Sequence, residues 1–162
     1  MAARTNQLVV TLPSDTEILL VREFDASRHL VWKAMTTPEL VKQWWGPRGS
    51  ELSVCEIDLR VGGEWRFVSR GDDGTEHPFK GVYKEITEPE RIVQTWIYDV
   101  APFNEFASIE TANLEEKDGR TTLRNHVQHQ TKEARDGHVN AGMEGGAAET
   151  MDRLEELLAN MS

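Results

Sequence analysis

Tyr83 and Glu85 are the two residues best placed to transfer protons, because they lie two positions apart in a segment with the alternating pattern of a β-strand. Residues two apart on a regular strand point to the same face. A carboxyl group in an apolar pocket has a raised pKa and can act as a general acid or base, and the Tyr83 phenol would add a hydrogen-bond donor. The alternative, which we favour, is that Glu85 is a charge at the strand end that reaches solvent or an arginine. We therefore assign no catalytic residue and keep this pair as a second interpretation.

The histidines and the single cysteine predict neither a metal site nor a nucleophile. His126 and His129 are three apart on a predicted strand, so they point to opposite faces. No thiolate or suitably spaced carboxylate completes a zinc ligand set around them, and we predict no bound metal. Cys55 lies in an apolar, alternating segment that favours burial over reactivity. Gly62 and Gly63 form a hairpin pattern rather than a phosphate-binding loop, and no other cofactor motif is evident.

Aromatic residues are more informative, since the chain of 162 residues contains five Trp, five Phe and two Tyr. Several share predicted strand faces, as Trp65 does with Phe67, and Phe79 with Tyr83. Ligand pockets are lined mostly by apolar side chains, so these faces predict a cavity wall. The alternative is ordinary packing in the core. The residues predicted to contact a ligand are Trp45, Trp65, Phe67, Phe79, Tyr83, Trp96 and Phe103 from strands and loops, and Met143, Ala147 and Met151 from a helix.

The elements that must position these residues are mostly strands joined by short turns. Between residues 51 and 130 apolar and polar side chains alternate, and turn signals such as Asp118-Gly119 recur at close spacing. An earlier strand is followed by two short helices, 28–35 and 38–45, the second with Pro38 at its first position. Residues 1–6 are expected to form a loose tail. The seven predicted strands are 17–24, 52–60, 64–70, 79–86, 91–98, 106–115 and 121–130.

The C-terminal segment, residues 137–161, has the pattern of one amphipathic helix. At 1.5 Å per residue it would be roughly 36 Å long and would cross the whole sheet. The first half of its buried stripe is lined by the small residues Gly146, Ala147 and Thr150, whereas the second half consists of Leu and Met. A curved sheet around such a helix would be packed at one end and open at the other, which predicts a cavity. Gly145 and Gly146 each cost about 1 kcal/mol in a helix, so we expect a local requirement for them.

Composition excludes several classes of protein. Eighteen Lys and Arg against 28 Asp and Glu give a net charge of −10, which disfavours binding to nucleic acid or to an anionic membrane. No apolar run approaches the ~20 residues of a membrane span, and residues 1–7 lack the apolar core of a secretion signal. A single Cys excludes an internal disulfide framework. We therefore expect a single-domain protein, residues 1–162, in the cytoplasm.

Four segments resemble motifs of the bacterial single-domain homologues of the heat-shock-protein-90 ATPase activator. They follow one another in the expected order, and the resemblance covers about residues 17–159. The segments are residues 25–47 with TPEL and WWGP, residues 60–68 with RVGGEWRFV, residues 81–93 with GVYKEI, and residues 142–154 with GMEGG.

The resemblance implies the helix-grip fold of the START or SRPBCC superfamily. This α+β fold wraps a curved seven-stranded antiparallel sheet around a long C-terminal helix, with a hydrophobic cavity between them. Relatives include lipid and hormone binders, polyketide cyclases and the co-chaperone itself, so the fold does not fix the function. We expect binding of a small hydrophobic or aromatic molecule in the cavity. One alternative is a cofactor-free cyclase or dehydratase that acts on a polyketide-like substrate.

A second alternative is a module that modulates a chaperone ATPase. We disfavour a chaperone partner because the co-chaperone carries a separate N-terminal domain, for which this chain has no room. An exposed edge strand would leave oligomer formation possible.

Overall fold

The computed structural model describes residues 6–161 and has an α+β fold with one large antiparallel sheet. Its order is β1-β2-β8-β7-β6-β5-β4-β3. The strands are β1 (Val9–Thr11), β2 (Glu17–Phe24), β3 (Glu51–Ile57), β4 (Glu64–Arg70), β5 (Glu76–Thr87), β6 (Arg91–Tyr98), β7 (Ser108–Lys117) and β8 (Arg120–Gln128). The helices are α1 (Arg28–Thr36), α2 (Pro38–Val41), the 3-10 helix η1 (Phe103–Glu105), α3 (Lys132–Asn140) and α4 (Met143–Ala159).

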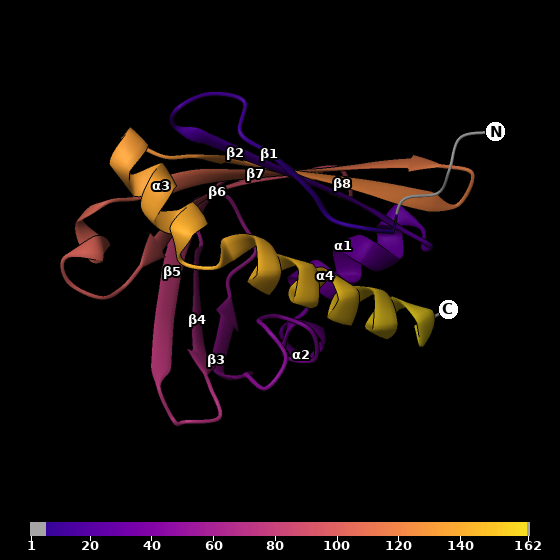
Figure 1. Ribbon diagram of the computed structural model, residues 1–162. Helices are drawn as coiled ribbons and strands as arrows, with labels where there is room; N and C mark the ends of the chain where they lie inside the picture. The colour runs from indigo at the N-terminus through magenta and orange to yellow at the C-terminus, as the bar shows by residue number, and fades with distance from the viewer. Residues whose placement is uncertain (1–5, 162) are drawn as a thin grey trace.

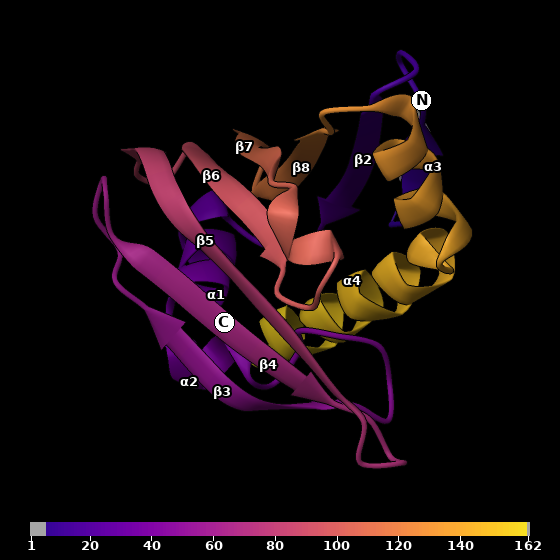
Figure 2. The same cartoon turned by 90° about the vertical axis from the view of Figure 1, so that its left-hand side faces the viewer.

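The sheet is strongly bent, and the C-terminal helices lie along its open side. Figure 1 shows α4 crossing the molecule next to both halves of the sheet. Figure 2 shows how β3–β5 and β7, β8 and β2 curve around an interior that α3 and α4 close. This arrangement is consistent with the helix-grip fold.

Within residues 6–161 the sheet has eight strands, so the prediction of seven was wrong by one. The seven predicted strands are all present, and residues 17–24, 64–70 and 91–98 have the predicted bounds. The additional strand β1 is only three residues long and pairs with β2 alone, with Val10 opposite Leu20. A segment this short is too brief to show the alternation by which strands are recognised in a sequence.

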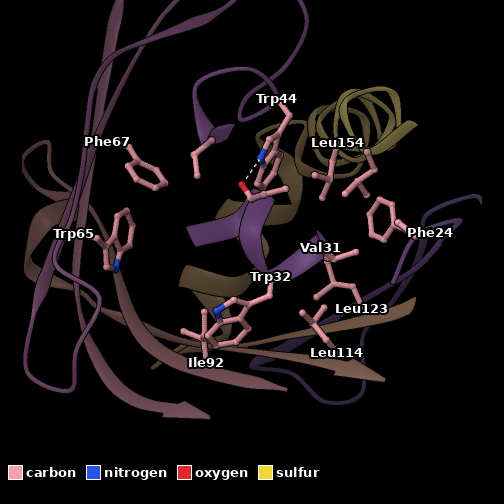
Figure 3. Close-up of a cluster of buried hydrophobic side chains, with 14 of the residues drawn as sticks. Phe24, Val31, Trp32, Trp44, Trp65, Phe67, Ile92, Leu114, Leu123 and Leu154 are labelled. Carbon is pink, nitrogen blue, oxygen red and sulfur yellow. Dashed lines mark hydrogen bonds between the residues drawn. The ribbon is translucent and has the colours of Figure 1, made fainter. Parts of the chain in front are cut away.

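The two short helices begin at the predicted residues, Arg28 and Pro38. The Ser27 hydroxyl accepts the Leu30 amide at the start of α1. Helix α2 has Pro38 at its first position but ends at Val41, before the predicted end at residue 45. The following turn brings the Trp44 indole under α1, where its Nε1 donates to the carbonyl of Ala34 at 2.9 Å (Figure 3).

The C-terminal segment forms two helices, which corrects the prediction of one. Helix α3 ends at Asn140, and α4 begins after Gly142, whose φ of +83° is left-handed and interrupts the helix. The seventeen residues of α4 span about 26 Å. Neither Gly145 nor Gly146 is required by a close contact, because a Cβ at either position would meet nothing within 4 Å.

The packed part of the core lies under the second half of α4. Leu154 and Leu158 of α4 meet Phe24 of β2 and Val31 of α1, and all four are almost completely buried. Figure 3 shows Leu154 next to Val31, Phe24 and Leu123, while Trp65 and Phe67 point inward from β4 on the other side. The expected asymmetry along the helix, with one end packed, is therefore present.

Most of the predicted loose tail, residues 1–5, lies outside the described residues. Asn6 is anchored, because its side-chain oxygen accepts from Arg120 at 2.7 Å and its nitrogen donates to Asp25 at 3.1 Å. Within residues 6–161, no helix is both long enough and apolar enough to cross a membrane.

Candidate functional site

A cavity of about 470 Å³ lies between the concave face of the sheet, the first half of α4 and the loop after α2. Strands β4, β5 and β6 supply most of its aromatic wall, whereas β7 and β8 supply its floor. Its position beside the small residues of α4 is the one that the sequence predicts. The volume is within the range of about 300–1,000 Å³ that is typical of small-molecule sites.

The aromatic wall is a chain of rings in mutual contact. The Trp45 ring centroid lies 5.3 Å from the centroids of both Phe67 and Phe79, in edge-to-face orientations. Phe79 in turn lies 4.7 Å from Trp96, and Trp65 lies 5.0 Å from Phe67. Such contacts are favourable beyond the burial of area, so the wall holds its shape without a ligand.

Small side chains of α4 form the opposite wall. Gly146, Ala147 and Thr150 line the cavity between Met143 and Met151. The Thr150 hydroxyl donates to the carbonyl of Gly146 at 2.8 Å, so its hydrogen-bonding capacity is used within the helix. This wall is therefore apolar in effect.

The structure brings nine of the ten predicted ligand-contacting residues to this cavity, namely Trp45, Trp65, Phe67, Phe79, Tyr83, Trp96, Met143, Ala147 and Met151. The exception is Phe103. Its side chain is 59% exposed on η1, where its ring packs 5.9 Å from that of Tyr98, and it does not line the cavity.

Tyr83 and Glu85 do not share a face, contrary to the prediction. Tyr83 is opposite Gln94 but Glu85 is opposite Val93, so a bulge in β5 between them inserts an extra residue. A bulge reverses the alternation of the side chains that follow it. Tyr83 therefore points into the cavity, whereas exposed Glu85 accepts from the Nε atom of Arg91 at 2.6 Å. The two residues form no acid–base pair.

A small polar group interrupts the apolar floor. Glu110 of β7 and Asn125 of β8 are diagonal neighbours on the concave face, since Glu110 is opposite Val127 and Asn125 is opposite Ala112. The Asn125 Nδ2 atom donates to Glu110 Oε1 at 2.9 Å. Burial raises the pKa of Glu110, and the bond from Asn125 only partly opposes this shift.

His138 of α3 also lines the cavity, where its ring stacks on Trp96. Its Nδ1 atom lies 3.0 Å from Nε2 of His129, which follows β8. Burial lowers the pKa of His138 to about 4, with a smaller contribution from the neighbouring His129. His138 is therefore neutral at pH 7, and the tautomers of the two rings determine which of them donates the hydrogen bond.

Arg22 is the basic residue beside the cavity, and its charge is already paired. Its guanidinium lies 3.2 Å from Asp152 and 3.4 Å from Glu155, both on α4, and stacks 4.8 Å above the Phe24 ring. These ion pairs connect β2 to α4, and only 3% of Arg22 is exposed to solvent.

The sequence analysis did not single out Glu110, Asn125 or His138. A signal exists for Asn125, which stands between Leu123 and Val127 on one face of a clearly alternating strand. The sequence gives no comparable signal for Glu110, because both faces of β7 carry a mixture of apolar and polar residues. His138 falls at the start of the single helix predicted for residues 137–161, so its approach to Trp96 depends on a break that the sequence pattern does not show.

His126 contacts Glu17 on the neighbouring strand and does not line the cavity. Within residues 6–161, no three His, Cys, Asp or Glu side chains are grouped as a metal site would need.

A curved antiparallel sheet that encloses an apolar cavity with a C-terminal helix defines a class of α+β proteins with an internal cavity. The chain matches the family model described as "Activator of Hsp90 ATPase homolog 1-like protein" over residues 25–159, and it belongs to this family. The resemblance stated from the sequence motifs is therefore confirmed.

Solved structures of bacterial single-domain proteins share the fold. A protein from Rhodobacter sphaeroides is 26% identical, with a TM-score of 0.87 over 96% of this chain and 100% of its own. A protein from Nitrosomonas europaea is 29% identical, with a TM-score of 0.80 over 93% and 98%. The AHSA1 protein from Silicibacter pomeroyi, 21% identical with a TM-score of 0.74 over 90% and 99%, shows similarity of fold alone. A comparison with curated proteins finds no match.

Proposed function

We propose that the protein binds a small hydrophobic or aromatic molecule in the cavity between its sheet and α4. The observation that carries this proposal is the cavity of about 470 Å³ with a continuous aromatic wall. Filling such a space with apolar surface contributes roughly 25 cal/mol for each Å² removed from water. The wall is held by its own ring contacts, so little ordering of the protein opposes binding.

Small residues on α4 support the proposal independently of the wall. A helix that served packing alone would fill the space below it with larger side chains. Gly146 and Ala147 leave it open, although the same helix fills its other end with Leu154 and Leu158. Catalysis by Tyr83 and Glu85 receives no such support, because Glu85 is exposed and paired with Arg91.

The test is binding of N-phenyl-1-naphthylamine, an uncharged fluorescent probe whose emission rises in apolar surroundings. We expect saturable binding to the protein and at least a tenfold loss of affinity in Ala147→Trp, because the indole occupies the cavity. Glu144→Trp is the matched control, since Glu144 is exposed on the same helix and does not line the cavity. It should bind like the unchanged protein.

Circular dichroism of both variants separates a filled cavity from a disrupted fold. If Ala147→Trp fails to fold, Ala112→Leu on the cavity floor provides the second variant, because Ala112 lines the cavity from β7. The proposal is wrong if the unchanged protein does not bind the probe, or if the control and the cavity variants lose affinity equally. Native mass spectrometry of gently purified protein would additionally identify a retained ligand by its mass.

A further inference from the structure

We propose that Glu110 is the polar anchor of the cavity, and that the bound molecule is an uncharged apolar or aromatic compound with a hydrogen-bond-accepting oxygen, of the ketone class, directed at Glu110 Oε2. This inference rests on the proposed function and specifies the chemistry of its ligand.

The first step concerns which oxygen of Glu110 is available. Oε1 accepts the amide proton of Asn125. Oε2 makes no hydrogen bond within residues 6–161. It is also absent from the set of unpaired side-chain atoms that are shielded from solvent, so it remains accessible from the cavity. Since Glu110 lines the cavity, Oε2 is the polar atom that the floor presents to a ligand.

The second step concerns the proton. A carboxyl group that loses its hydration is stabilised as the neutral acid unless a cation compensates it. The basic residue beside the cavity, Arg22, is paired with Asp152 and Glu155 on α4. Because Asn125 donates to Oε1, the acid proton belongs on Oε2. The floor therefore offers a donor to the cavity, and this agrees with the raised pKa of Glu110.

The third step concerns what the donor needs. The Oε2 donor faces the cavity, so an apolar ligand that fills this space removes the water that would otherwise accept from it. The donor then needs an acceptor on the ligand, because a polar group that loses its hydrogen-bond partner on burial weakens binding. A purely apolar ligand would not require a carboxyl in its site. A ketone-type oxygen accepts from Oε2, whereas a ligand carboxylate would bring an uncompensated negative charge into an apolar space.

The experiment compares benzophenone with diphenylmethane, two uncharged molecules that differ by one carbonyl oxygen. Both are measured by displacement of N-phenyl-1-naphthylamine at pH 6. We expect the unchanged protein to bind benzophenone about tenfold more tightly, which is the ratio that one hydrogen bond of roughly 1.4 kcal/mol gives.

Three variants locate the preference. Glu110→Met keeps the length of the side chain but removes the donor, so the ratio should fall to near one while diphenylmethane still binds. Glu110→Gln keeps a donor in the same place and should retain most of the preference. Glu115→Met is the matched control, because Glu115 is exposed on the same strand and lies outside the cavity. It should leave the ratio unchanged.

The outcomes separate the two proposals. Binding of neither ligand contradicts the proposed function itself. Equal binding of both ligands to the unchanged protein, or a preference that persists in Glu110→Met, overturns the role of Glu110 but leaves the cavity as a binding site. Tighter binding of the cation benzhydrylamine than of benzophenone, lost in Glu110→Gln, would show an ionised Glu110 and likewise overturn the proposal.

Discussion

The Nε2 atom of His129 lies 3.0 Å from the Nδ1 atom of His138, and this contact joins the end of β8 to α3 beside the cavity. Two imidazoles at this distance can share a hydrogen bond only while at least one of them is neutral. Burial lowers the pKa of His138 to about 4 and also lowers that of His129, for which Arg135 adds a smaller electrostatic contribution. Protonation of both rings at acid pH should therefore break this contact and weaken the packing of α3 against the end of β8.

We predict that acidification destabilises the protein through His138. The pKa of His138 is lower in the folded state than the ordinary value of 6.5, so the unfolded chain binds more protons as the pH falls from about 6.5 to 4. Stability is then lost over this window, by on the order of 1–3 kcal/mol. Urea denaturation of the unchanged protein and of His138→Phe at pH 7 and pH 4 measures the difference.

His138→Phe should lose less stability than the unchanged protein, because the ring that stacks on Trp96 is retained and the titrating group is gone. His29→Phe is the control, since His29 is exposed on α1. The prediction is wrong if the unchanged protein and His138→Phe lose equal stability between the two pH values.

Gly145→Ala is predicted to stabilise the protein by about 0.5–1 kcal/mol, because Gly145 is helical and a Cβ there would meet nothing within 4 Å. Thermal unfolding followed by circular dichroism measures this change. The contrasting variant is Gly81→Ala on β5, whose Cβ would lie 1.9 Å from the Thr95 carbonyl oxygen. It should destabilise the protein by roughly 2 kcal/mol or more. A loss of stability in Gly145→Ala would mean that the helix requires this glycine for a reason other than space.

Much of the fold could be predicted because local patterns and the final structure agree. The residues predicted for β2, β4 and β6 agree with the observed bounds, and α1 begins at the predicted residue 28. The break between α3 and α4 could not be found this way, since the apolar stripe continues through it. Only the backbone angle of Gly142 shows that the chain changes direction there.

The site was predictable where side-chain class alone decides the position, as for the aromatic wall. It was not predictable where register decides. The bulge after Tyr83 removes Glu85 from the cavity, and no local signal in the sequence marks that extra residue. Glu110 is the acid that does reach the cavity, and its place depends on how β7 aligns with β6 and β8.

The last prediction is that Glu110 lowers the stability of the folded protein at neutral and higher pH. Because burial raises the pKa of Glu110 above its ordinary value of 4.5, the folded protein holds this proton more tightly than the unfolded chain does. The stability associated with the neutral acid is fully present below pH 4.5 and is lost as the pH rises through the pKa of the folded state. Glu110→Gln has no such proton to lose.

Urea denaturation at pH 5 and pH 8 should therefore show Glu110→Gln gaining stability relative to the unchanged protein as the pH rises. Glu115→Gln, an exposed position on the same strand, should follow the unchanged protein at both pH values. Parallel profiles for Glu110→Gln and the unchanged protein would contradict the prediction. The predicted gain in stability of Glu110→Gln at pH 8 would show that Glu110 is a destabilising acid on the cavity face of β7. Binding of a ligand would give a physical reason for such an acid to be there.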